Sequence, residues 1–143
     1  MLFRSVAPPV WHTYNGSQYF IDDTPTMRWE DARNFCLNVG ADLPIITSRD
    51  QNKFIWELSL AQETVTEFGV WIGLYRKADN EFYWVNGEKF HEGVYRPWGG
   101  NNPDNYNGKE GCVHVIHGEW NDFLCDANDE VLKAPVVVCQ KKI

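Results

Sequence analysis

The sequence lacks several features that would place it in a common class of protein. No apolar run in its 143 residues approaches the roughly 20 residues that span a bilayer, and residues 1–5 contain no apolar stretch of signal-peptide length. Basic residues are scarce, because 13 Lys and Arg against 20 Asp and Glu give a net charge of -7. That sign is wrong for a surface that binds nucleic acid. We expect no membrane insertion and no nucleic-acid partner, and we expect any signal peptide to have been removed or to lie outside this chain.

Internal repeats, low-complexity tracts and charge runs are also absent. A length of 143 residues suits one domain, since domains usually have roughly 100 to 200 residues. Aromatic residues make up 15% of the chain, including seven Trp, which is too many for a disordered protein. The sequence predicts a single folded domain over residues 1–143.

The four cysteines, Cys36, Cys112, Cys125 and Cys139, contain no C-x-x-C spacing. This excludes a zinc ribbon and a thioredoxin-like motif. Two disulfides are the favoured interpretation, with three possible pairings, although four buried free thiols are an alternative. Disulfides would indicate an oxidising compartment, so we expect a secreted or extracellular protein.

Two helices are predicted in the first half of the chain. Residues 27–39 place apolar side chains at helical spacing and are followed by Gly40, a typical helix stop. Ser48 and Gln51 have the spacing of a capping box at the start of a second helix. The apolar stripe of that helix comprises Phe54, Ile55, Leu58 and Ala61.

Short strands are predicted in the second half. They cover residues 70–74, 82–85, 112–116 and 135–139, and a turn at Asn86-Gly87 follows the second of them. Asn15-Gly16 reads as the turn of a β-hairpin, although Asn15-Gly16-Ser17 is also an N-glycosylation sequon. Residues 91–111 are rich in Gly, Asn and Pro and have no periodicity, and loops of this length usually serve a function.

Side chains with hard oxygen donors gather in this loop and in a second polar segment, as at Asn102, Asp104, Glu110, Asn121 and Asp122. Carboxylate and amide oxygens are the ligands that Ca²⁺ prefers. A disulfide between Cys112 and Cys125 would bring the two segments together. Three carboxylates held close repel one another unless a cation or strong donors offset their charge. The alternative is a solvated loop whose Asn and Asp side chains only cap turns.

Catalysis finds little support in the sequence. His114 and His117 would lie on opposite faces of a strand and so could not share a metal ion, and His12 and His91 lack companions. No Ser, His and Asp set or activated Cys is apparent. The three acidic residues of the loop region could in principle act as a glycosidase set, but carboxylates that bind an ion are poor proton donors. We expect a protein without enzymatic activity.

Four motifs follow one another in an order that resembles the C-type lectin domain, in its short four-cysteine form, over nearly the whole chain. They are Trp71-Ile72-Gly73-Leu74, Asn102-Pro103-Asp104, Glu110-Gly111-Cys112 and Trp120-Asn121-Asp122. The resemblance implies a double-loop α+β domain with two helices and short antiparallel sheets. It also implies disulfides joining Cys36 with Cys139 and Cys112 with Cys125, and a cis bond before Pro103.

Carried over by motif, the resemblance implies one principal calcium ion, because Asn105 and Gly111 lack the carboxylates of an auxiliary site. The implied metal ligands are Asn102, Asp104, Glu110, Asn121 and Asp122. The same residues, with Tyr106 as a stacking ring, would bind carbohydrate. The amide-Pro-acid order of residues 102–104 usually accompanies galactose or N-acetylgalactosamine binding.

Two alternatives to galactose binding remain open. The same site could bind mannose-type or other glycans, or the domain could recognise protein without sugar. The expected partners are glycans or glycoconjugates. Because single sites of this kind bind weakly, a homo-oligomer would supply avidity.

Overall fold

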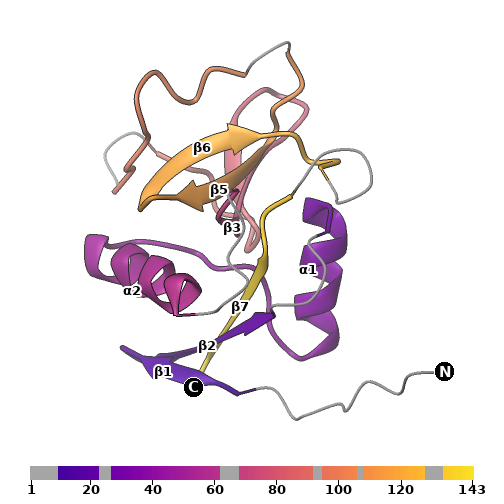
Figure 1. The fold of residues 1–143 in the computed structure, drawn as a ribbon. Helices are drawn as coiled ribbons and strands as arrows, with labels where there is room; N and C mark the ends of the chain where they lie inside the picture. The colour runs from indigo at the N-terminus through magenta and orange to yellow at the C-terminus, as the bar shows by residue number, and fades with distance from the viewer. Residues whose placement is uncertain (1–9, 23–26, 62–67, 92–94, 106–107, 128–133) are drawn as a thin grey trace, which may run out of the picture.

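The computed structural model describes residues 10–22, 27–61, 68–91, 95–105, 108–127 and 134–143, and within them it has two helices and two antiparallel sheets (Figure 1). The elements in chain order are β1 (His12–Tyr14), β2 (Ser17–Asp22), α1 (Trp29–Asn38), α2 (Arg49–Leu60), β3 (Val70–Arg76), β4 (Phe82–Trp84), β5 (Cys112–Ile116), β6 (Glu119–Phe123) and β7 (Val137–Lys142). The predicted α+β class is confirmed. Neither helix, within the described ranges, is long and apolar enough to cross a membrane.

The first sheet has the strand order β1-β2-β7 and joins the two ends of the described chain. Its hairpin turns at Asn15 and Gly16, whose φ angles of 46° and 82° are both left-handed. Asn-Gly is the preferred pair for such a two-residue turn, so the predicted turn is confirmed. β7 pairs along the whole of β2, from Ser17 with Lys142 to Asp22 with Val137.

The second sheet has the strand order β4-β3-β5-β6. Strands β4, β3 and β5 match the predicted strands to within two residues at each end. The strand predicted at 135–139 is β7 of the first sheet, and it begins at 137 and continues to 142. β6 was missed, because its centre was interpreted as a polar segment of the loop. Burial nevertheless alternates along it, since Trp120 and Asp122 are buried and Asn121 and Phe123 are only partly so. The alternation of apolar and polar residues that marks a strand was not visible in the sequence, because a buried position of β6 is occupied by an aspartate, Asp122.

Local hydrogen bonds set the end of α1 and the start of α2. After α1, Gly40 has a φ of 77°, its N–H donates to the Leu37 carbonyl, and the Ala41 N–H donates to the Cys36 carbonyl, which is the Schellman arrangement. At the start of α2, the Ser48 hydroxyl accepts from the Gln51 N–H at 3.1 Å. The Gln51 side chain reaches the N–H of Thr47 instead of that of Ser48, so the capping box is formed with a shifted partner.

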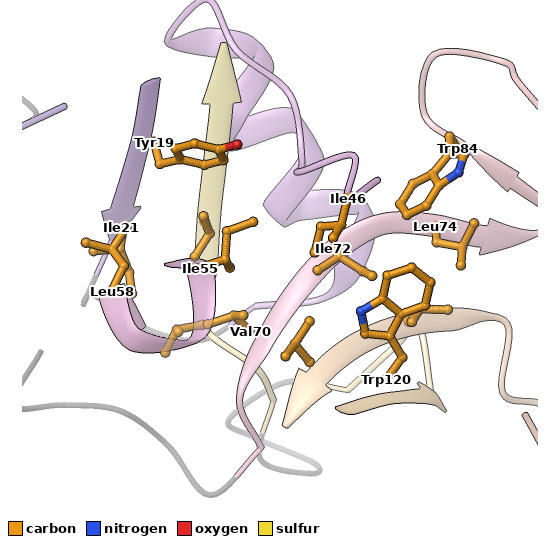
Figure 2. Close-up of a cluster of buried hydrophobic side chains, with 14 of the residues drawn as sticks. Tyr19, Ile21, Ile46, Ile55, Leu58, Val70, Ile72, Leu74, Trp84 and Trp120 are labelled. Atoms are coloured by element: carbon orange, nitrogen blue, oxygen red, sulfur yellow. The ribbon is translucent and has the colours of Figure 1, made fainter. Parts of the chain in front are cut away.

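Two disulfides link the elements in the pairing that the resemblance implied. Cys36 on α1 bonds Cys139 on β7, and Cys112 on β5 bonds Cys125 just after β6. Buried side chains from both sheets and α2 fill the space between the sheets (Figure 2). Trp120 lies among them beside Trp84 and Leu74, and its ring is fully buried. Tyr95 and Trp98 of the long loop pack against this same cluster, so the core and the second sheet together support the base of the loop.

Candidate functional site

The long loop runs beyond the outer edge of the second sheet (Figure 1). Its base is attached to β6 by two backbone hydrogen bonds, from the Gly99 N–H to the Trp120 carbonyl at 3.0 Å and from the Trp120 N–H to the Pro97 carbonyl at 2.8 Å. Among the residues of 91–111 that are described, no named helix or strand occurs, as predicted. The loop is therefore positioned by its attachment to β6 and by its own polar contacts.

Three of the predicted site residues converge where the loop meets β6. Asp104, Glu110 and Asp122 each offer a carboxylate oxygen, and these oxygens lie within 4.8 Å of one another. We call these three residues the carboxylate cluster. Asp104 is exposed, Glu110 is half-buried and Asp122 is completely buried. The cluster thus opens to solvent on the side of the loop and rests on β6.

Asp122 is the structural centre of the cluster. Its Oδ1 accepts from the Asp104 N–H at 3.1 Å, and its Oδ2 accepts from the Asn105 N–H at 2.7 Å. The Arg76 guanidinium donates to the same Oδ2 at 3.3 Å. The Asn105 side chain in turn accepts from the Glu110 N–H at 3.1 Å. The buried Asp122 carboxylate thus joins β3, β6 and the middle of the loop, and Asn105 connects it to Glu110 near the end of the loop.

The predicted amide ligands take different positions. Asn102 is half-buried and is followed by the cis peptide bond to Pro103 that the resemblance implied. Asn121 lies on β6 next to Asp122, and its side-chain N–H donates to Nε2 of His114 on β5 at 2.9 Å. Its amide oxygen is the atom left for a ligand role. Tyr106, the predicted stacking ring, lies outside the described residues.

The donor set of the cluster fits a calcium ion. Three carboxylates carry a charge of -3, and the guanidinium of Arg76 offsets one unit, so these four groups sum to -2. A divalent cation balances that sum, and an all-oxygen set is what Ca²⁺ prefers over softer metals. Without a cation the closest carboxylates repel each other.

His114 supports the neighbouring part of the site as a neutral ring. Its Nδ1–H donates to the Phe68 carbonyl, which leaves Nε2 as the acceptor for Asn121. The ring also stacks on Phe123 with a centroid distance of 4.7 Å. Burial disfavours the charged form and lowers the pKa of His114 to about 4. His114 therefore orients the Asn121 amide from β5 and is not a metal ligand in this arrangement.

This burial predicts a loss of stability in mild acid. The folded-state pKa of about 4 lies below the ordinary 6.5, so between these values the unfolded chain binds a proton that the folded chain does not. The free energy of unfolding should fall from pH 6.5 to pH 4 by about 3 kcal/mol because of this one group. Urea unfolding in a calcium chelator would measure the slope. His114→Gln should flatten it and His91→Gln, at an exposed position, should not; equal slopes in all three proteins would contradict the prediction.

Arg76 and Asn105 are the members of the site that the sequence patterns did not indicate. Arg76 follows the predicted strand by two residues and lies 46 positions from its partner Asp122, so no local motif connects them. Asn105 was considered only as a position without a carboxylate, yet both its N–H and its side chain brace the loop. The one available signal was a basic pair, Arg76-Lys77, at the end of an apolar strand in an acidic chain.

Comparisons with known proteins agree with this architecture. A family model described as Lectin C-type domain matches residues 25–140. Lectin BRA-3 from Megabalanus rosa is 34% identical over 136 residues, which cover 90% of this chain and 78% of that protein. Human asialoglycoprotein receptor 2 is 32% identical over 145 residues, which cover 97% of this chain and 42% of the receptor. The solved carbohydrate-recognition domain of the mouse scavenger receptor C-type lectin superposes with a TM-score of 0.74 at 29% identity, covering 95% of this chain and 96% of that one.

The chain spans less than half the length of its receptor relatives, from 21% for mouse C-type lectin domain family 4 member F to 42% for mouse asialoglycoprotein receptor 1 and for the human receptor. The family model nevertheless covers most of the chain, and the two disulfides are those of the short form. On these grounds the chain belongs to the C-type lectin domain family.

Proposed function

We propose that this domain binds carbohydrate through a single calcium ion held by the carboxylate cluster. The observation that carries the proposal is the convergence of Asp104, Glu110 and Asp122 to within 4.8 Å beside a loop open to solvent. A fixed charge excess of this kind at an exposed position is costly unless a cation offsets it. The oxygens of Asn102 and Asn121 would complete the ligand set.

Each kind of side chain would have a distinct role toward the sugar. When bound, calcium supplies a Lewis-acidic centre that accepts lone pairs from two neighbouring sugar hydroxyls. The carboxylates of Asp104 and Glu110 would accept hydrogen bonds from those hydroxyls, and the Asn102 side chain would donate to them. Bonds to ionised groups are stronger than those between neutral groups, so orientation of the hydroxyls would depend chiefly on the two acids.

Galactose or N-acetylgalactosamine is the sugar that we propose. The support is the amide-Pro-acid order of Asn102, Pro103 and Asp104, with Tyr106 available two residues later to stack on the apolar face of the ring. A human relative is by its name a receptor for asialoglycoproteins, which are glycoconjugates. Mannose-type binding at the same site is the alternative. The galactose-type triplet usually has Gln before its proline, and Asn102 has a shorter side chain than Gln.

Titration calorimetry tests the proposal directly. We expect a dissociation constant of about 1 mM for galactose in the presence of calcium, weaker binding of mannose, and no detectable heat after a chelator is added. Galactose binding that persists unchanged in the chelator would refute the calcium-bridged mechanism. Preference for mannose would leave the mechanism in place and change only the specificity.

A second candidate function is recognition of a protein without sugar. It is favoured by the buried ion pair between Arg76 and Asp122, which already compensates part of the charge of the cluster. A glycan array without binding in the presence of calcium would favour this candidate. Neither function involves catalysis, and we infer that the domain is not an enzyme.

The proposed setting of the domain is extracellular. Both disulfides are formed, one across 103 positions of the sequence and one across 13, and such bonds persist in oxidising compartments. Millimolar affinity for one sugar becomes useful when several sites act together. A solved relative at 30% identity is named as a trimeric structure of the receptor Clec4f, so we propose that assembly of several copies supplies avidity here as well.

A further inference from the structure

Arg76 contributes a permanent positive charge to a site that we propose binds a positive ion. Its backbone N–H donates to the Gly111 carbonyl at 2.7 Å, and its Nη2 lies 3.3 Å from Oδ2 of Asp122. The exposed fractions of the two side chains are 14% for Arg76 and 0% for Asp122. This pair is withdrawn from water, and removing one partner of such a pair leaves an uncompensated charge.

The remaining contacts of the guanidinium fix its position but leave the buried Nε donor without a partner among the described residues. Its central carbon lies 4.3 Å from the centroid of the Phe82 ring, and Nη1 donates to the Asn80 carbonyl at 3.4 Å. A buried donor without a partner costs free energy. The interaction that offsets this cost is the ion pair between the Arg76 guanidinium and the Asp122 carboxylate.

The ion pair is also connected to the loop. Oδ2 of Asp122, which Arg76 contacts, accepts from the Asn105 N–H, and Oδ1 accepts from the Asp104 N–H. An Asp122 carboxylate held by Arg76 therefore holds the backbone that carries Asp104. A metal ion bound to the carboxylate cluster would draw on the same carboxylate, and two cations that share one carboxylate oppose each other.

We propose that Arg76 is a built-in cation of the carboxylate cluster, with two effects. It keeps Asp122 and the adjoining loop in place when no metal is bound, and it weakens calcium binding by charge repulsion. The first effect requires nothing beyond the contacts described above. The second rests on the proposed function. The binding of calcium and the presence of the Arg76 charge are thus negatively coupled.

Arg76→Met, which keeps much of the length of the side chain and removes its charge, tests both effects. In a calcium chelator we expect its melting temperature to fall by about 10 °C, as for a broken buried ion pair in a chain of this size. Saturating calcium should restore more than half of that loss. Calorimetry should give a calcium dissociation constant about tenfold lower than in the unchanged protein, the Coulomb effect of one charge on a divalent ion that shares its carboxylate.

Arg33 offers a matched control. It forms a similar pair with Asp42, with Nε–Oδ1 at 3.2 Å, but the two side chains are 31% and 29% exposed and lie on α1 and the segment after it. Arg33→Met should lower the melting temperature by only a few degrees, by the same amount with and without calcium, and should leave calcium affinity unchanged. Arg76→Lys keeps the charge but loses the planar guanidinium that stacks on Phe82, so it should retain only part of the stability and stay within about twofold of the original calcium affinity.

The outcomes separate the two proposals. Equal losses of melting temperature for Arg76→Met with and without calcium, or unchanged or weaker calcium binding, would overturn the role of Arg76. Folding of that variant only in calcium would support it in its strongest form. Arg76→Met could fail to fold both with calcium and in the chelator. In that case an Arg76→Lys protein that also fails to fold would overturn the proposed role of the Arg76 charge, and one that folds would support it. Absence of calcium binding in the unchanged protein would refute the proposed function, while the melting temperatures in chelator would still test the first effect.

Discussion

Replacing Glu110 by Gln is expected to raise the calcium dissociation constant about 100-fold or more and to abolish millimolar sugar binding. The substitution keeps the shape of the side chain and removes one of three converging negative charges. The charge of the three carboxylates and Arg76 would then fall from -2 to -1, which no longer balances a divalent ion. Asp104→Asn should act in the same direction for the same reason. Calcium calorimetry followed by galactose titration would measure both losses.

Glu119→Gln is the control for this experiment. Glu119 is an exposed carboxylate on β6, close to the loop at Gly99 but outside the carboxylate cluster. Its replacement should change calcium affinity less than threefold, the screened effect of one exposed charge. If Glu110→Gln bound calcium as tightly as Glu119→Gln does, the ligand assignment would be wrong.

Trp120→Ala is expected to lower the free energy of unfolding by about 5 kcal/mol, at the upper end for a buried aromatic residue. The ring is completely buried and contacts four other aromatic rings, with centroid distances of 5.7 to 6.1 Å, in Trp84, Phe90, Tyr95 and Trp98. Its indole N–H donates to Oδ1 of the buried Asn52 at 2.9 Å, and the loss of that donor leaves a buried acceptor without a partner. Urea denaturation would measure the change.

Two further variants divide this effect into its parts. Trp120→Phe retains most of the ring packing and should cost about 2 kcal/mol, chiefly through the lost hydrogen bond to Asn52. Trp56→Ala, at a half-buried position on α2, should cost less than Trp120→Ala. Because the Tyr95 and Trp98 rings of the loop contact the Trp120 ring, Trp120→Ala should also weaken calcium binding. A cost below that of Trp56→Ala would contradict the predicted contribution of the Trp120 ring to stability, and unchanged calcium binding would mean that this ring does not support the loop.

The elements that could be predicted from the sequence are those with local causes. Gly40 ends α1 through its own left-handed φ, Ser48 caps α2 three residues ahead of its partner, and Asn15-Gly16 closes a hairpin within four residues. Each of these signals lies within one turn of the chain, so spacing alone is sufficient. The carboxylate residues were indicated by a different signal, the gathering of oxygen donors in the long loop and at residues 121–122, and the resemblance then implied their role as ligands.

The elements that could not be predicted depend on partners far along the chain. β6 places Asp122 on its buried side, where a polar residue is tolerated only because Arg76 and two loop N–H groups satisfy it. Asn121 is oriented by His114 seven residues earlier, and the neutral state of that ring follows from burial. The burial of a polar side chain and its pairing across 46 positions leave no periodic signal in the sequence, so the charge balance of the site emerges only from the fold.

The sheet that unites β1, β2 and β7 brings both ends of the described chain to the pole of the molecule opposite the long loop (Figure 1). A stalk or anchor fused at either end would consequently leave the loop pointing away from its support. If several copies stood side by side on such supports, their loops would all point in the same direction, which suits simultaneous contact with a surface that carries many glycans.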